Sequence, residues 1–313
     1  MPRIVYLAPA AHVRTGGNKA IFRHVEALCA LGYEALVRIE GDRAAPTWFE
    51  HAAPVERGDA PLKDDDVLVI PDDDAETLRA CAGRPNRKVV LVQNPYWAAT
   101  RGLPLLTFQE RAAYRTFLVC SQGVAAWVAR YFDYELISVA PGFADERVFV
   151  PAAKAPFIAV VPRKRRTEFQ AIRYMFERLY GGATPWRWAV LEGRSEAEVA
   201  QALGRASVFL SLARLEGMSM TIVEAMACEC LVAGFTGLGA REYTSSINGL
   251  WVEEDDCEAA ARALLRAVAM AEADAGEAAL MRHAARSTAA QWSHAAFVRA
   301  LESFWRENMG VAP

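Results

Sequence analysis

Short apolar runs alternate with helix-like patterns along the first half of the chain. The runs are compact and rich in β-branched residues, which is typical of strands buried in a parallel sheet. The predicted strands are 4–8, 34–40, 67–70, 89–93, 116–120 and 136–140. Two glycines, Gly16 and Gly17, follow the first strand and precede a predicted helix that ends at Gly32. This order of strand and helix predicts a doubly wound parallel sheet.

The same pattern starts again after a segment that resembles a linker, residues 141–156, which contains Pro141, Pro151 and Pro156. The predicted strands of the second half are 157–161, 187–192, 207–212 and 231–235. The predicted helices are 166–180, 195–206, 221–229, 257–273 and 297–308. We therefore expect an α/β protein of two Rossmann-like domains, residues 1–150 and 151–291, followed by a last helix in residues 292–313.

Composition agrees with two filled cores. The chain has 313 residues, of which 53% are hydrophobic and 23% charged, which excludes a disordered or low-complexity protein. The formal net charge is −3, without the basic excess typical of nucleic-acid binding, so no nucleic-acid partner is expected. Six cysteines show no complete zinc pattern, and no apolar segment is long enough to span a membrane. We expect a cytoplasmic protein, and peripheral contact with the inner face of a membrane stays open.

The most informative stretch is residues 211–243. A strand end leads to Glu216 and Gly217, and a predicted helix then carries Glu224, so that seven residues separate the two glutamates. The first amides of this helix are expected at the carboxyl end of the sheet, where ligands of open α/β sheets bind. We expect Ser219 or Thr221 to cap the helix. A second glycine-rich turn, 237–242, follows the next strand.

This stretch resembles the signature of the GT-B glycosyltransferases, specifically the retaining family 4. The matching residues are 216–219, the run Glu-Ala-Met-Ala at 224–227, and the turn 237–242. Weaker similarities cover 120–132, the linker 139–151, and 291–305, which resembles the family's closing helix that crosses back to the first domain. Departures are Met218 and Ser219 in place of Phe-Gly, Glu229 in place of Gly, and Leu231 in place of Pro. A Glu at position 229 is expected to need a different helix ending from the family's tight turn.

The resemblance implies roles for individual residues. Glu224 corresponds to the glutamate that binds the nucleotide ribose, and Glu216, Gly217, Met218 and Ser219 correspond to the contacts with the donor sugar. Arg163, then Lys164, are the best matches to the cations that clamp the diphosphate, and with Glu216 they are the expected catalytic residues. Arg165 and Arg166 complete a run of cations that cannot all face one ligand. Gly16 and Gly17 correspond to the glycine-rich turn under the donor.

Two further segments carry candidate site residues, His12 and Asp72–Asp74. His12 lies near Gly16, but a lone histidine is more often structural. The run Asp72–Asp74 after a predicted strand is similar to the metal-binding Asp-x-Asp of the other glycosyltransferase fold, GT-A, whereas Asp74 to Leu78 also fits a capped helix start. The capped helix is the preferred interpretation.

The resemblance implies an enzyme that transfers a sugar from a nucleoside diphosphate sugar, with retention and without metal or cofactor, in a cleft between two domains. The expected partners are a nucleotide sugar and a carbohydrate, lipid-linked or small-molecule acceptor. Two alternatives stay open: a non-catalytic descendant that binds a nucleotide sugar or a partner protein, and a GT-B nucleotide-sugar epimerase.

Overall fold

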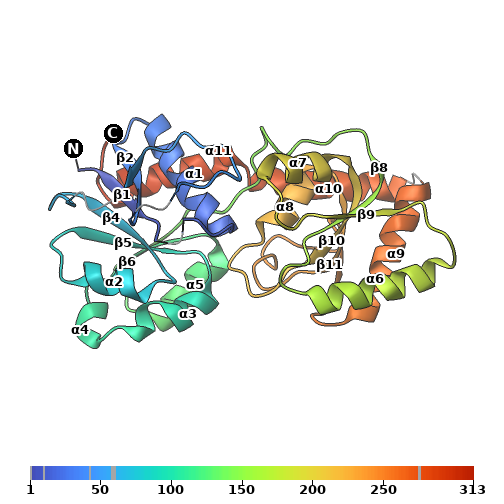
Figure 1. Cartoon of the computed structure of the whole chain (residues 1–313), viewed down its shortest axis with the longest axis horizontal. Coiled ribbons are helices and arrows are strands. Elements are labelled where there is room, and N and C mark those ends of the chain that lie inside the picture. Colours follow the sequence, from blue (N-terminus) through green and yellow to red (C-terminus); the bar gives the residue numbers. More distant parts are fainter. Residues whose placement is uncertain (1, 10, 42–43, 58–60, 274–275) are drawn as a thin grey trace. The chain divides into compact units, whose positions relative to one another are not determined.

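The computed structural model describes residues 2–9, 11–41, 44–57, 61–273 and 276–313, which form two compact units (Figure 1). Unit 1 comprises the chain up to Gly142 together with Ala295–Pro313, and unit 2 comprises Phe143–His294. Each unit is a parallel sheet with helices on both faces. The α/β class and the two Rossmann-like sheets predicted from the sequence are confirmed.

The sheet of unit 1 has the strand order β3-β2-β1-β4-β5-β6-β7, and all its neighbours pair in parallel. All six predicted strands are present. The short strand β3 was not predicted, because its sequence Val-Glu-Arg contains no apolar run. The strands are β1 (Ile4–Leu7), β2 (Ala35–Ile39), β3 (Val55–Arg57), β4 (Val67–Pro71), β5 (Arg87–Val92), β6 (Thr116–Val119) and β7 (Leu136–Val139).

Helices cover the two faces of this sheet because alternate strand residues point to opposite sides. On one face, residues such as Val5 and Leu7 pack with α2, α3 and α5. On the other face, Tyr6 packs against His24 of α1, which in turn contacts Phe297 of α11. The helical segments are α1 (Gly16–Ala30), α2 (Ala75–Ala82), α3 (Pro95–Arg101), the 3-10 turn η1 (Leu103–Leu105), α4 (Phe108–Arg111), α5 (Gln122–Tyr131), α11 (His294–Ser303) and the π-turn η2 (Phe304–Asn308).

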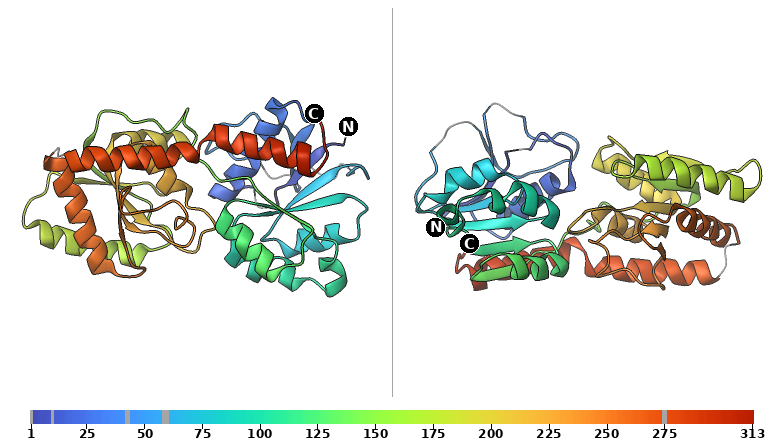
Figure 2. Two further views of the ribbon diagram at one scale, coloured as in Figure 1. Left: turned by 180° about the vertical axis from the view of Figure 1, so that it is seen from behind. Right: turned by 90° about the horizontal axis from the view of Figure 1, so that it is seen from below.

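The last helix of the chain packs beside the first one in unit 1 (Figure 2). His24 of α1 lies between Tyr6 and Phe297, with its ring centroid 4.8 Å from that of Phe297. Its Nδ1 lies 3.1 Å from the hydroxyl of Tyr6. Burial lowers the pKa of His24 to about 3, so the imidazole is neutral at physiological pH.

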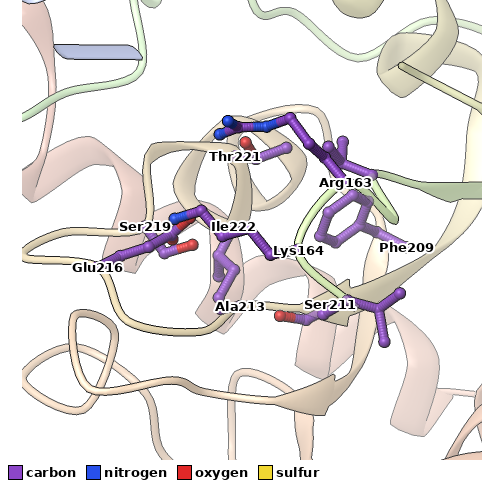
Figure 3. Close-up of a pocket in the computed structure, with 11 residues that line it drawn as sticks. Arg163, Lys164, Phe209, Ser211, Ala213, Glu216, Ser219, Thr221 and Ile222 are labelled. Atoms are coloured by element: carbon purple, nitrogen blue, oxygen red, sulfur yellow. The ribbon is translucent and has the colours of Figure 1, made fainter. Parts of the chain in front are cut away.

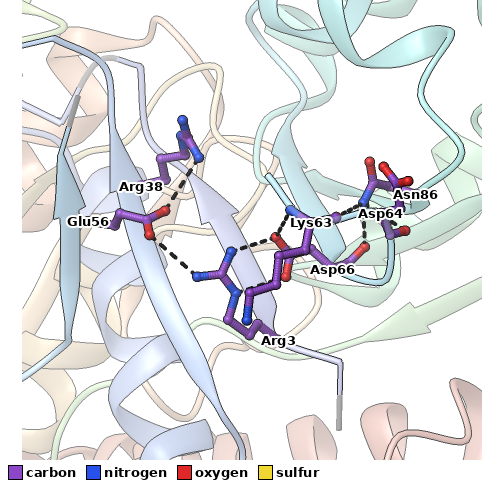
Figure 4. A network of polar contacts seen from close by, with 7 residues as sticks. All are labelled: Arg3, Arg38, Glu56, Lys63, Asp64, Asp66 and Asn86. Carbon is purple, nitrogen blue, oxygen red and sulfur yellow. Dashed lines mark hydrogen bonds and ion pairs between the residues drawn. The ribbon is translucent and has the colours of Figure 1, made fainter. Parts of the chain in front are cut away.

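A polar network closes the amino end of this sheet (Figure 4). Arg3, just before β1, binds both carboxylate oxygens of Asp66, just before β4, at 2.8 and 2.9 Å. The same guanidinium reaches Glu56 of β3, which also pairs with Arg38 of β2. Asn86 donates to the carbonyl of Asp66 at 2.9 Å. These contacts join the four neighbouring strands β1, β2, β3 and β4.

The sheet of unit 2 has the order β12-β11-β10-β8-β9, again entirely parallel. Its strands are β8 (Ala155–Val160), β9 (Arg187–Val190), β10 (Ala206–Leu212), β11 (Leu231–Phe235) and β12 (Leu250–Val252). Its helices are α6 (Arg166–Tyr180), α7 (Glu196–Arg205), α8 (Met220–Ala227), α9 (Cys257–Ala273) and α10 (Gly276–Gln291). Helices α6 and α9 pack on the apolar residues of one face.

Two elements of unit 2 were not predicted. Strand β12 is short and half-buried, and the buried stripe of α10 is mostly alanine, which makes its helical period weak. All the other predicted helices and strands of this half are confirmed, including α6 and α9 with the expected bounds.

The strand order of unit 2 creates a switch point. From β8 the chain moves outward to β9, then returns to β10 on the other side of β8. In open α/β sheets the crevice at the carboxyl ends of two such strands is where ligands bind. The loops that leave β8 and β10 carry the cations 163–166 and the motif 216–219.

Candidate functional site

An open pocket of about 420 Å³ lies at the carboxyl ends of β8 and β10 (Figure 3). It brings together the loop after β8, the loop after β10 and the first residues of α8. Four residues predicted from the sequence line it: Arg163, Lys164, Glu216 and Ser219. The remaining lining residues are Val161, Phe209, Ser211, Leu212, Ala213, Thr221 and Ile222.

Arg163 and Lys164 both line the pocket, but they differ in their partners. Arg163 is exposed and makes no hydrogen bond or ion pair within the described part of the chain. Lys164 places its Nζ 2.5 Å from Oε1 of Glu216 and 3.3 Å from the carbonyl of Arg214. The pocket therefore holds one unpaired cation and one ion pair.

The next two cations point elsewhere. Arg165 is buried, with its side chain 1% exposed, and pairs with Glu254 and Asp255 from the loop after β12. Arg166 lies on the surface and pairs with Glu192 at 2.5 Å. Neither residue lines the pocket. The expectation that four adjacent cations cannot all face one way is confirmed, and the two that line the pocket are Arg163 and Lys164.

The amino end of α8 opens into the pocket without a side-chain cap. Ser219 occupies the N-cap position, but its hydroxyl makes no capping hydrogen bond. The prediction that Ser219 or Thr221 caps this helix is therefore wrong. Ser219 has φ −98° and ψ 85°, whereas the capping Ser195 of α7 has the extended values φ −70° and ψ 162°. The uncapped end presents backbone amides and the positive end of the helix dipole to a ligand.

The second glycine-rich turn supports the loop that precedes α8. A Cβ on Gly239 would lie 2.8 Å from the backbone of both Glu216 and Met218, so only glycine allows the two turns to pack this closely. Tyr243, which follows that turn, donates its hydroxyl hydrogen to the carbonyl of Ser219 at 2.8 Å. Sequence reasoning missed Tyr243, because nothing in its position indicated a contact with residue 219. Met218 is buried in the turn, and neither it nor Gly217 lines the pocket.

Glu224 lies within α8 and is 5% exposed. It is not among the residues that line the pocket. Its expected contact with a ribose stays a prediction.

Glu229 adopts the left-handed conformation, with φ 59°, just after the end of α8. The expectation that a Glu at this usual glycine position needs a different helix ending is therefore wrong. The tight ending is kept, and Oε1 of Glu229 lies 2.5 Å from Nη1 of Arg286 on α10. Leu231, at the usual proline position, is a buried residue of β11.

Gly16 and Gly17 lie in unit 1, where they form the first residues of α1 rather than a turn before it. The hydroxyl of Thr15 accepts a hydrogen bond from the amide of Asn18 at 3.1 Å, which starts the helix one residue before Gly17. A Cβ on Gly17 would lie 2.2 Å from Oε1 of Gln93, and Nε2 of Gln93 donates to the carbonyl of Gly17. Gly17 thus permits a close contact between α1 and the end of β5.

The alternative metal site at Asp72–Asp74 finds no support. Asp74 caps α2 through the amides of Glu76 and Thr77, as the preferred interpretation predicted. Asp72 is buried and accepts a hydrogen bond from the amide of Asn94, and burial raises the pKa of its carboxyl. Within the described ranges, no group of three or more His, Cys, Asp or Glu side chains is arranged to hold a metal ion. His12 is exposed in the turn before α1.

Among the helices that the structure describes, none is long and apolar enough to cross a membrane.

Two parallel-sheet α/β units are the architecture of the GT-B fold, and unit 2 carries a cationic pocket at its switch point. Residues 177–270 match the family described as "Glycosyl transferases group 1". Over 275 residues the chain is 24% identical to an alpha-1,6-glucosyltransferase of Actinobacillus pleuropneumoniae serotype 7 (strain AP76), covering 81% of this chain and 80% of the relative.

Solved structures share the fold. The sucrose-phosphate synthase of Thermosynechococcus elongatus superposes with a TM-score of 0.75 at 16% identity, covering 99% of this chain and 100% of that one. Anabaena HepE in complex with UDP-glucose gives 0.68 at 15% identity, covering 96% and 98%. The fold, the family match over part of unit 2 and the curated relative all make this chain similar to GT-B glycosyltransferases.

Proposed function

We propose that this protein transfers a sugar from a nucleoside diphosphate sugar with retention at the anomeric carbon, and that it needs no metal ion. The observation that carries the proposal is the pocket at the switch point of unit 2. There, an unpaired arginine, a lysine and the uncapped end of α8 meet. Each of these features attracts an anion, and together they suit a diphosphate.

The leaving diphosphate gains negative charge as the glycosidic bond breaks. Arg163, Lys164 and the amides of α8 would stabilise that charge, which is the role that a divalent cation has in other transferases. Because these groups are fixed before the reaction, little reorganisation is needed in the transition state. A protein base is not required if the leaving phosphate accepts the proton of the acceptor hydroxyl on the same face.

The glutamates would hold the other parts of the donor. Glu216 lines the pocket beside Lys164 and would accept hydrogen bonds from sugar hydroxyls, with the backbone of Gly217, Met218 and Ser219 close by. Glu224 would bind the ribose hydroxyls. These roles follow the family resemblance.

The named relatives suggest which donor to test first. The curated relative is a glucosyltransferase that forms α-1,6 linkages, and HepE binds UDP-glucose. UDP-glucose carries an α-linked sugar, so an α-linked product would mean retention. We propose glucosyl transfer from UDP-glucose to a carbohydrate acceptor.

The test is a panel of UDP-, GDP- and ADP-sugars with simple sugar acceptors, in which release of the nucleoside diphosphate is measured. NMR of the anomeric proton in the product then gives the stereochemistry. We expect release from one nucleotide, an α-linked product and unchanged rates in EDTA. Binding of a nucleotide sugar without turnover would instead support a non-catalytic binding protein, and interconversion of donor sugars would support an epimerase. Loss of activity in EDTA that manganese restores would contradict metal independence.

A further inference from the structure

The ion pair between Lys164 and Glu216 joins two groups that the proposed function assigns to different parts of the donor. Nζ of Lys164 and Oε1 of Glu216 lie 2.5 Å apart, and both side chains line the pocket (Figure 3). Their side chains are 25% and 22% exposed, so the pair is only partly screened by water. In the ligand-free protein each group therefore already has a partner of opposite charge.

Arg163 provides the contrast on the same loop. It makes no hydrogen bond or ion pair within the described residues, and in Figure 3 its guanidinium points away from the carboxylate of Glu216. An anion can bind Arg163 without breaking any contact. An anion that also takes Lys164 must compete with Glu216.

We propose that the Lys164–Glu216 pair is a partner-exchange contact that makes the pocket favour a nucleoside diphosphate sugar over the nucleoside diphosphate alone. This inference rests on the proposed function. When a donor binds, Lys164 moves from the carboxylate to the diphosphate, and the sugar hydroxyls become the new partners of Glu216. When only the diphosphate binds, Glu216 loses its ion pair with Lys164, and no sugar hydroxyl replaces it.

The exchange also favours product release. After transfer the sugar leaves with the acceptor, and Glu216 is again without a partner. Glu216 then competes with the diphosphate for Lys164, which weakens binding of the nucleoside diphosphate product. A pocket built only of cations would bind donor and product with similar strength, because the diphosphate is common to both.

The test compares wild type with Glu216→Gln by calorimetry, with the nucleoside diphosphate among UDP, GDP and ADP that wild type binds most tightly, and with its glucose conjugate. Glutamine removes the charge that holds Lys164 and keeps the size of the side chain. We expect Glu216→Gln to bind the nucleoside diphosphate about fivefold more tightly than wild type, since a partly exposed ion pair no longer has to be broken. The same variant should bind the glucose conjugate no more tightly than wild type, so the preference for the conjugate over the diphosphate falls at least about fivefold.

Two controls separate exchange from simple removal of a negative charge. Glu177→Gln removes the same charge from an exposed pair with Arg173 on α6, outside the pocket, and should leave both affinities unchanged. The double variant with Lys164→Met should abolish the gain, because the lysine that Glu216 competes for is gone. Circular dichroism confirms that each variant is folded.

The outcomes are distinct. Unchanged or weaker binding of the nucleoside diphosphate to folded Glu216→Gln overturns the exchange and leaves the donor pocket intact. A gain of the same size in the Lys164→Met background also overturns it, because general repulsion then accounts for the effect. If wild type binds none of the three nucleoside diphosphates, the proposed function itself fails.

Discussion

The guanidinium carbon of Arg165 lies 4.4 Å from the centroid of the Phe235 ring, inside unit 2. Its Nε donates to the carbonyl of Ala213, at the end of β10, and its two terminal nitrogens pair with Glu254 and Asp255. Glu254 in turn accepts a hydrogen bond from the amide of Gly237 at 2.8 Å. Arg165 thus ties the loops after β8, β10, β11 and β12 together beneath the pocket.

Arg165→Met should destabilise unit 2 by about 2 kcal/mol, because two acidic side chains and a carbonyl lose their charged donor. The acids are partly exposed and can be hydrated, which limits the loss. Urea unfolding followed by tryptophan fluorescence measures the change. Arg166→Met, which removes a surface pair, serves as the control and should change stability by less than about 0.5 kcal/mol. Equal effects of the two substitutions would contradict the buried role of Arg165.

Arg163→Ala should lower kcat and raise KM for the donor, since the cation meets a charge that grows in the transition state. Arg163→Lys should restore activity only in part, because a point charge lacks the bidentate fork of a guanidinium. Steady-state kinetics measure both. Arg166→Ala should behave as wild type, because Arg166 pairs with Glu192 and does not line the pocket. Normal turnover of Arg163→Ala together with an inactive Arg166→Ala would mean that the diphosphate lies on the other side of the loop.

Glu224→Ala should weaken binding of the nucleoside diphosphate by about 1.5–3 kcal/mol, the value for a lost hydrogen bond to a charged group. Glu216→Ala should instead lower turnover without weakening binding of the nucleoside diphosphate, because its expected partner is the sugar. Calorimetry and kinetics on the same preparations separate the two effects. Since Glu224 is buried, thermal unfolding must show that the variant is folded. Unchanged nucleotide affinity in folded Glu224→Ala would remove the ribose assignment.

His24 should make unit 1 less stable in acid. Its folded pKa of about 3 lies below the ordinary value of 6.5, so the unfolded chain binds the proton and the folded unit does not. The free energy of unfolding of unit 1 is therefore highest above pH 6.5 and falls as the pH drops toward 3. Between pH 6.5 and 5 the loss should be roughly 2 kcal/mol, at about 1.4 kcal/mol per pH unit.

The measurement is urea unfolding at pH 7.5, 6 and 5. His24→Gln keeps a polar side chain beside Tyr6 but does not titrate, so its stability should depend less on pH over this range. The free energy of unfolding must change less steeply with pH in His24→Gln than in wild type; a difference in its value at one pH is not enough. Parallel pH profiles would show that His24 does not carry the acid sensitivity.

Much of the fold could be predicted from the sequence, because buried strands and amphipathic helices leave a local pattern. Runs of β-branched and other apolar residues located ten of the twelve strands that the structure describes, and the alternation of strands with helices predicted parallel pairing. The short edge strands β3 and β12 and the alanine-rich helix α10 were not predicted. Short edge strands and alanine stripes differ little in hydrophobicity from the residues around them, so they leave no clear pattern in the sequence. The group 216–219 and Glu224 could be selected only because their spacing resembles a known family.

By itself, the sequence determined that four consecutive cations follow the first strand of the second sheet, and that a helix with a glutamate follows the third. Only the tertiary structure decided what each cation does. Side-chain direction depends on the turn between β8 and α6 and on the loops that surround it, and these come from distant parts of the chain. Arg165 is buried and pairs with acidic residues of the loop after β12. Arg166 pairs with Glu192 at the surface, and Lys164 pairs with Glu216 in the pocket. Arg163 is left exposed in the pocket because no described residue lies close enough to pair with it, and that spatial fact has no counterpart in the linear sequence.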